Sequence, residues 1–196
     1  MNIGDCFIRP PMGGRSRSIW RIVSIEGAEC RADLYDFGEQ GIYCYRAEPV
    51  GLRRVSTFIP VSKELFDRVE RYYNQALASA HNIISSAQRW KSQHVEFGTC
   101  LYTEEAGYQG VMKLIAQSGD NGMLAEYIHV SPKSFSRETI RPGIISLSQY
   151  EDDDTKTAIQ TEVYDKLLKI MNLYYTTIQT LVNQAAANAQ HNKTTI

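Results

Sequence analysis

The sequence has no long apolar run, few cysteines and almost no net charge. Its 196 residues include 21 Lys and Arg against 22 Asp and Glu, which gives a formal net charge of −1. A chain this close to neutrality has no overall attraction for polyanions, so contact with nucleic acid requires a local patch. No window approaches the roughly 18 consecutive apolar residues of a membrane-spanning helix. We therefore expect no membrane span.

The sequence also lacks an export signal and a pattern of metal ligands. Its start, Met1–Asp5, has neither the positive charge nor the apolar segment of a secretory signal, so we expect a cytoplasmic protein. Structural zinc sites usually take their ligands in close pairs, and the cysteines form no such pair. We expect no metal and no cofactor. The thiols should be small buried apolar residues: Cys6, Cys30, Cys44 and Cys100.

Common catalytic motifs are absent as well. There is no GxSxG, HExxH, Walker A or GxGxxG sequence. The four histidines are scattered, and the acidic run Glu151–Asp154 lacks the spacing and the glycine of a calcium loop. We expect a non-enzymatic protein. An enzyme whose site carries no recognisable motif is an alternative that ranks after the assembly and nucleic-acid-binding hypotheses described below.

The two halves of the sequence resemble each other in ordered blocks. Matching blocks occur at nearly constant separation and in the same order, which predicts a tandem duplication rather than two unrelated halves. The pairs are Gly4–Ile8 with Gly98–Tyr102, Trp20–Val23 with Met112–Ile115, Ala32–Tyr35 with Ala125–Ile128, Glu64–Val69 with Glu162–Leu167, Tyr72-Tyr73 with Tyr174-Tyr175, and Ala87-Gln88 with Ala189-Gln190.

The first part of each half, residues 1–61 and 95–150, is predicted to be rich in β-strands. Runs of β-branched and aromatic residues such as Ile19–Ile25 alternate with short clusters of turn residues such as Pro10–Gly14. Short strands over this length suit a small five-stranded barrel or a strongly bent sheet. An SH3-like barrel is one such topology. Together with the long helices described next, these strands predict an α+β fold.

The second part of each half, residues 62–94 and 151–196, is predicted to be one long amphipathic helix. Ser62 is a good N-cap for the first helix, and carboxylates near Asp154 favour the start of the second. The tail from His191 is expected to fray. Each helix has two apolar lines, which together form a stripe too wide to be buried on one side alone.

The wide stripes predict assembly. We expect an adaptor protein, or a component of a larger particle, that self-associates or binds partner proteins through its helices. The expected interface residues are Leu65, Val69, Tyr72, Tyr73, Leu77, Leu167, Ile170, Tyr174, Tyr175 and Ile178.

Nucleic-acid binding through the first β-rich part is the alternative. Arginine suits phosphate and base-edge contacts because its guanidinium forms two parallel hydrogen bonds, and aromatic rings provide stacking surfaces. The second half lacks a comparable set of arginines. The residues expected to bind nucleic acid are Arg9, Arg15, Arg17, Trp20, Arg53 and Arg54.

Overall fold

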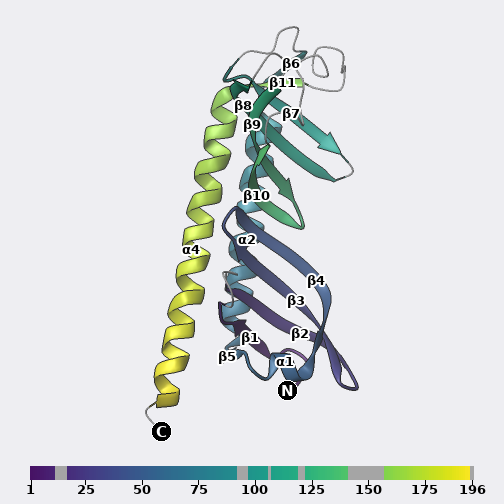
Figure 1. Ribbon diagram of the computed structural model, residues 1–196, viewed down its shortest axis with the longest axis vertical. Helices are drawn as coiled ribbons and strands as arrows, with labels where there is room; N and C mark the ends of the chain where they lie inside the picture. The colour runs from purple at the N-terminus through teal and green to yellow at the C-terminus, as the bar shows by residue number, and fades with distance from the viewer. Residues whose placement is uncertain (12–16, 92–96, 106, 119–121, 141–156, 195–196) are drawn as a thin grey trace. The chain divides into compact units, whose positions relative to one another are not determined.

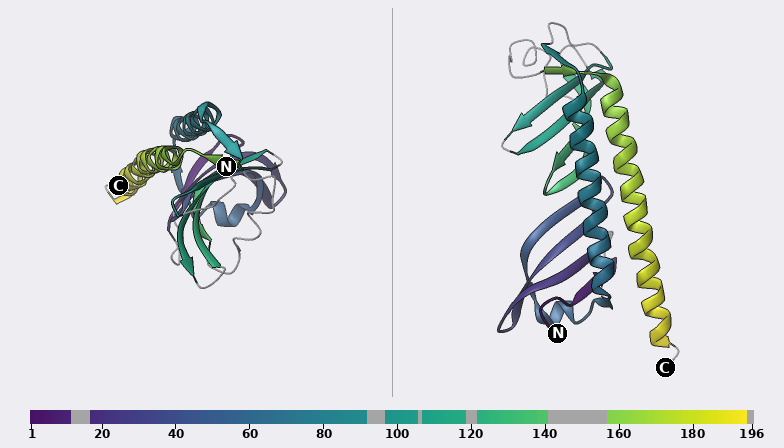
Figure 2. Two further views of the ribbon diagram at one scale, coloured as in Figure 1. Left: turned by 90° about the horizontal axis from the view of Figure 1, so that it is seen from above. Right: turned by 180° about the vertical axis from the view of Figure 1, so that it is seen from behind.

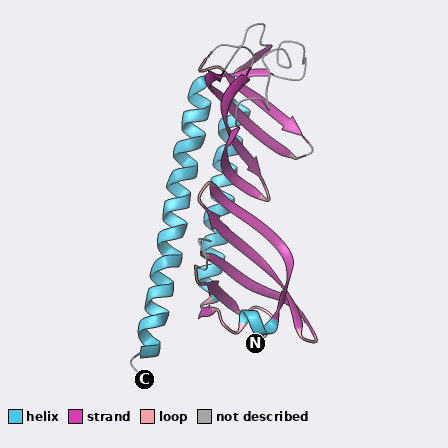
Figure 3. Ribbon diagram, viewed as in Figure 1, coloured by secondary structure: helices cyan, strands magenta, loops and turns pink. Residues whose placement is uncertain are grey.

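The fold consists of antiparallel strands and two long helices, so the class is α+β (Figures 1 and 3). The computed structural model describes residues 1–196 except 12–16, 92–96, 106, 119–121, 141–156 and 195–196. The chain divides into two compact units. Unit 1 comprises Met1–Gln75 and Leu173–Ile196, and unit 2 comprises Ala76–Asn172. Arg15, the acidic run at 151–154 and the expected boundary at 150 lie outside the described residues.

Unit 1 contains a five-stranded antiparallel sheet in the order β5-β1-β2-β3-β4. A short helix, α1 (Leu52–Val55), connects the last two of these strands in sequence. No pairing within unit 1 joins β4 back to β5 among the described residues, so the expected closed barrel is not observed there. The strands are β1 Cys6–Arg9, β2 Ser18–Glu26, β3 Glu29–Gly38, β4 Gly41–Gly51 and β5 Ile59–Val61.

Both faces of the unit 1 sheet are buried. Leu34 points into a cluster with Trp20 and Phe58, whose rings lie 5.5 Å apart. The next residue, Tyr35, points to the opposite face, because neighbouring side chains alternate along a strand. It is fully buried there, and its ring centroid lies 5.5 Å from that of Phe66 on the following helix.

Unit 2 contains a second antiparallel sheet, in the order β10-β9-β8-β7-β11-β6. If β6 is set aside and the order is followed from β11 to β10, the strands come as fifth, first, second, third and fourth of their unit. The strands of unit 1 come in the same order. The second and third strands also share a register shift, between Ile22 and Ser24 in unit 1 and between Leu114 and Ala116 in unit 2. The strands are β6 Arg89–Lys91, β7 Cys100–Glu105, β8 Tyr108–Ser118, β9 Gly122–Ser131, β10 Ser134–Ile140 and β11 Thr157–Ile159.

The first long helix, α2 (Lys63–Ser86), begins as predicted and ends earlier. Ser62 caps it, because its hydroxyl accepts the backbone N–H of Leu65 at 3.3 Å. The prediction that the helix reaches residue 94 is wrong. Residues 89–91 instead form β6, which pairs with β11. The apolar periodicity did not reveal this end, because the strand that pairs with β6 lies far away in the sequence.

The second long helix, α4 (Thr161–Thr194), begins later than the predicted residue 151 and remains helical into its tail. Residues 157–159 do not belong to it, because they pair with β7 as β11. At the other end the helix continues through His191 to Thr194, where fraying was expected. Among the described residues, no helix contains a stretch long and apolar enough to cross a membrane.

The greater part of the apolar stripe of each helix is buried within the chain. In unit 1, α2 covers one face of the sheet (Figures 1 and 2). The ring of Tyr72 on α2 lies 6.4 Å from that of Tyr174 on α4. The fully buried helix residues are Phe66, Val69, Ala76, Ala80, Ile84, Leu167, Ile178, Val182 and Ala186. These helices therefore serve first as cover for the sheets.

Gly110 on β8 leaves the space that the ring of Tyr127 on β9 occupies. A Cβ atom at residue 110 would overlap the Tyr127 ring and its hydroxyl, which lies 2.5 Å from Thr103 Oγ1. We expect Gly110→Ala to lower the free energy of unfolding by about 1–3 kcal/mol, because the ring must move. Urea unfolding followed by circular dichroism measures this change.

Gly51→Ala is the matched control for this prediction. A Cβ atom at residue 51 would meet nothing within 4 Å, and its φ of −69° suits any residue. We expect a change within about 0.5 kcal/mol. Equal effects of the two substitutions would contradict the close contact at Gly110.

Candidate functional site

A network of five charged side chains connects the sheet of unit 1 to α2. Arg21 on β2 lies 3.4 Å from Asp33 on β3, 3.4 Å from Asp67 on α2 and 3.5 Å from Glu70 on α2. Arg46 on β4 lies 3.1 Å from Asp33 and 3.0 Å from Glu70. We call these five residues the unit 1 network. Two guanidinium groups, one on β2 and one on β4, thus hold one carboxylate from β3 and two from α2.

Neutral groups complete the unit 1 network. The Tyr35 hydroxyl donates to Glu70 Oε1 at 3.2 Å and accepts from Arg46 Nη2 at 3.1 Å. Burial raises the pKa of this phenol far above its usual range, so it remains protonated. Arg21 lies over the ring of Phe66, 4.3 Å from its centroid. Since each carboxylate faces a guanidinium, this arrangement suits helix attachment rather than proton transfer.

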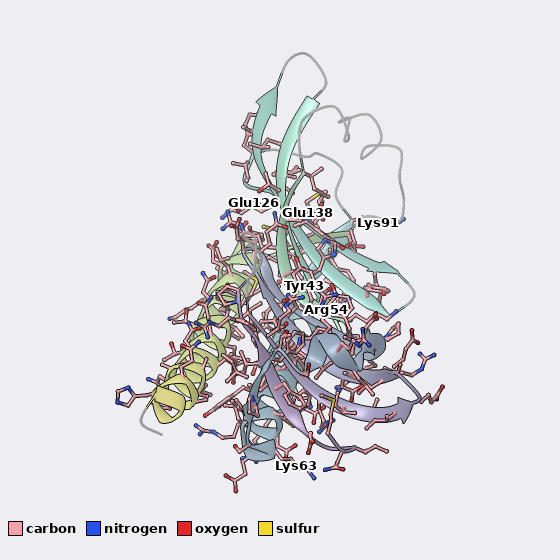
Figure 4. The ribbon with its side chains drawn as sticks, turned by 60° about the horizontal axis from the view of Figure 1, so that its bottom comes forward. Tyr43, Arg54, Lys63, Lys91, Glu126 and Glu138 are labelled. Carbon is pink, nitrogen blue, oxygen red and sulfur yellow. The ribbon has the colours of Figure 1, made fainter. Side chains whose placement is uncertain are left out.

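Unit 2 contains a comparable network. Lys113 Nζ on β8 lies 3.1 Å from Asp165 Oδ1 on α4 and 5.2 Å from the ring centroid of Tyr164. The Tyr164 hydroxyl donates to Glu126 Oε2 on β9 at 2.6 Å. Glu126 also pairs with Arg137 on β10 (Figure 4 labels Glu126). We call Lys113, Glu126, Arg137, Tyr164 and Asp165 the unit 2 network.

The two networks place the same kinds of residue at the same positions. Each has a cation on the second strand, an acid on the third strand and an arginine on the fourth. Each also has an aspartate near the start of the long helix, preceded by an aromatic ring that lies under the cation. The sequence blocks that align Arg21 with Lys113 and Asp33 with Glu126 contained this signal. The network residues were not recognised as a group from the sequence.

A hydrogen-bonded chain of polar side chains lies in unit 2. His81 Nδ1 and Gln109 Oε1 are 2.8 Å apart, and Gln109 Nε2 donates to the Tyr102 hydroxyl at 3.2 Å. Tyr102 donates in turn to Glu104 at 2.6 Å. Because an amide oxygen only accepts, His81 Nδ1 is the donor in this hydrogen bond. Burial, with the hydrogen bond to Glu104, raises the pKa of Tyr102 to about 12.

The expected interface residues fall into two groups. Six are buried inside the chain, so they stabilise its own core: Leu65, Val69, Tyr73, Leu77, Leu167 and Ile178. The other four are half-buried and keep part of their surface accessible: Tyr72, Ile170, Tyr174 and Tyr175.

The structure does not bring the expected nucleic-acid-binding residues together. Trp20 is 8% exposed, and its indole donates to Ser18 Oγ at 2.7 Å, so its ring belongs to the core. Arg9 pairs with Asp36 at 3.2 Å, while the half-buried Arg17 has one nitrogen, Nη1, out of contact with water. Arg53 and Arg54 are exposed on α1, where Figure 4 labels Arg54.

The cysteines are buried and unpaired, as the sequence predicted. Burial raises the pKa of Cys6 to about 11 and that of Cys100 to about 11. Burial also raises the pKa of Cys30 and of Cys44. The part of the chain that the structure describes contains no group of three or more His, Cys, Asp or Glu side chains placed to hold a metal ion.

Comparison with known proteins does not assign the chain to a family. No family model matches the sequence, and no curated protein matches it. Among solved structures, one match is a quaternary ammonium Rieske monooxygenase, with 9% identity over 96% of this chain and 75% of that chain. The TM-score of 0.19 is too low to indicate a common fold. The match therefore carries no argument about function.

Removing the central cation of each network tests its role in helix attachment. We expect Arg21→Met to lower the free energy of unfolding by about 1–2 kcal/mol, because three carboxylates lose a partner. Lys113→Met should cost less, about 0.5–1 kcal/mol, because Lys113 holds one exposed aspartate. Urea unfolding provides both values.

Arg31→Met is the matched control, since Arg31 is exposed on β3 and donates only to the carbonyl of Ala47 in the described contacts. Its free energy of unfolding should stay within about 0.5 kcal/mol of the wild type. A loss as large as that of Arg21→Met would show that the network has no special role.

The buried thiols should resist alkylation in the native protein. Only the thiolate reacts, and burial disfavours it, so labelling by iodoacetamide near pH 8 should be at least about tenfold slower than in urea. The native pKa of about 11 for Cys6 and Cys100 lies above the ordinary 9.0. Their contribution to stability is therefore complete below pH 9 and is lost as the pH rises toward 11. Rapid native labelling of these cysteines would contradict the buried placement.

Proposed function

We propose that this protein is a non-enzymatic assembly or adaptor protein, built as a tandem repetition of a sheet followed by a long helix, that binds a second copy or a partner protein through α4. A component of a larger particle fits this description. The main observation in support of this proposal is the exposed surface of α4 in unit 1, where Leu173 is 62% exposed.

The solvent-facing side of α4 has an unusual composition. Between Lys169 and His191 the helix contains no Asp, Glu, Lys or Arg. Surface helices normally carry charged side chains on the side opposite their apolar stripe. Leu173, Tyr174, Thr177 and Leu181 instead form a line of accessible or half-buried side chains, which we call the α4 ridge. A charge-free ridge beside half-buried tyrosines favours contact with another protein.

Two independent likenesses support the tandem repetition. The strand order of the two sheets is the same once β6 is set aside. The two networks repeat four charged positions and one aromatic position. Unrelated halves have no reason to share both features. The charged side chains of each network pair with one another inside the chain. The α4 ridge is not part of either network, so it is available for binding.

Size-exclusion chromatography with multi-angle light scattering tests the assembly. We expect a mass that is a multiple of 22.2 kDa and falls to 22.2 kDa on dilution or in Leu173→Glu. A charge placed on the α4 ridge must be desolvated in the interface, which weakens association by about tenfold or more.

Asn183→Glu adds the same charge to an exposed position of the same helix, on the polar side away from the α4 ridge. It should leave the mass of the assembly unchanged. A protein that remains at 22.2 kDa at every concentration would contradict self-association through α4.

Nucleic-acid binding stays the alternative, through the exposed Arg53 and Arg54. Recording absorbance at both 260 and 280 nm during the same chromatography tests it. A raised ratio that falls in high salt and in an Arg53→Ala, Arg54→Ala double variant would favour this alternative.

A further inference from the structure

In unit 2, a short strand covers the outer edge of β11. Residues 89–91 form β6, which pairs antiparallel with β11, with Trp90 opposite Ala158. The guanidinium of Arg89 lies 4.0 Å from the ring centroid of Tyr102 and donates to the carbonyl of Ile84 at 3.0 Å. These contacts hold an extended segment at the sheet edge, directly after the end of α2.

In unit 1, the corresponding edge belongs to β5, which ends the strand order among the described residues. β5 occupies the place of β11, since each pairs antiparallel with the first strand of its sheet and precedes the long helix. Val61 stands opposite Cys6 as Ile159 stands opposite Cys100. No strand among the described residues pairs with the other side of β5. An open edge presents backbone groups that can pair with a further strand.

A groove lies beside this open edge. It has a volume of 340 Å³ and is formed by the end of β5, the first turns of α2 and the last turns of α4. Its apolar lining includes Val61, Leu65 and Ala189, while Glu64 and Arg68 provide polar groups. The groove thus combines an apolar surface with a strand edge, as peptide sites that work by strand addition do.

We propose that this groove binds an extended segment of a partner protein, which adds to the unit 1 sheet antiparallel to β5 as β6 adds to β11. The inference rests on the proposed binding function and names a second surface for it, separate from the α4 ridge. The pairing of β6 with β11 argues for an extended segment rather than a helix as the occupant.

Pro60 sets a limit on this pairing. It stands opposite Phe7 and has no N–H. Proline is accommodated at a sheet edge when its nitrogen faces away from the neighbouring strand, so its carbonyl faces the open side. A bound segment can therefore donate to Pro60 but receives no hydrogen bond from it. In β11 the equivalent residue is Ala158, which offers both groups to β6.

Selection from a displayed library of random nonapeptides against the full-length protein tests the proposal. Enriched peptides, made synthetically with a fluorescein label, are titrated with protein by fluorescence anisotropy. We expect Ala189→Phe, which fills the groove, to weaken binding at least about tenfold. Ala187→Phe makes the same change at an exposed position of the same helix and should leave binding within about twofold. Thermal unfolding verifies that both variants fold.

Pro60→Ala distinguishes strand addition from simple filling of the groove. The new N–H supplies a second hydrogen bond, so binding should tighten by about threefold to tenfold. Unchanged or weaker binding would overturn strand addition.

The remaining outcomes separate this inference from the proposed function. If no peptide is enriched, or if Ala189→Phe binds as well as the wild type, the groove is not the site. Either result leaves association through the α4 ridge to be decided by the Leu173→Glu measurement.

Discussion

A sheet of short strands exposes two faces, and in unit 1 both must be covered for the sheet to be stable. Leu34 and Tyr35 are adjacent in sequence, point to opposite sides and are both buried. One side closes on its own cluster around Trp20, while the other requires α2. Burial of apolar surface supplies the main stabilisation. The part of α2 that packs on this sheet therefore belongs to the core of unit 1.

Apolar contact is not directional, so it does not by itself fix where a helix lies on a sheet. In unit 1 the charged network adds directional contacts between the sheet and α2. Arg21 reaches two carboxylates one helical turn apart on α2, Asp67 and Glu70, and a third on the neighbouring strand. Exposed ion pairs contribute little energy singly, but several that share one guanidinium give the helix and the sheet more than one directional contact at the same place. Unit 2 reaches the same result with Lys113 and fewer partners.

The two sheets differ at the edge formed by their fifth strand. β11 meets β6 through Ala158, which has a backbone N–H. β5 has Pro60 at that place and leaves a groove beside the helices. Proline at an edge also limits uncontrolled strand pairing between molecules.

The sequence by itself determined the local features of this protein. Runs of β-branched and aromatic residues between turn residues predicted the strands, and the capping side chain of Ser62 predicted the start of α2. The ordered blocks aligned Arg21 with Lys113. Each of these depends on neighbours within a few residues or on direct comparison of the two halves. The apolar cysteines were also identified correctly, because no ligand spacing competed with burial.

Only the tertiary structure decided where the helices end and which apolar residues remain accessible. α2 stops at Ser86 because residues 89–91 pair with a strand far along the chain. Trp20 was expected to offer a stacking surface to bases, but it lies in a core cluster. Leu65 and Val69 were expected at an interface and are core residues, whereas Leu173 is exposed. Periodicity shows that a helix has an apolar side, but what covers that side depends on contacts between distant segments.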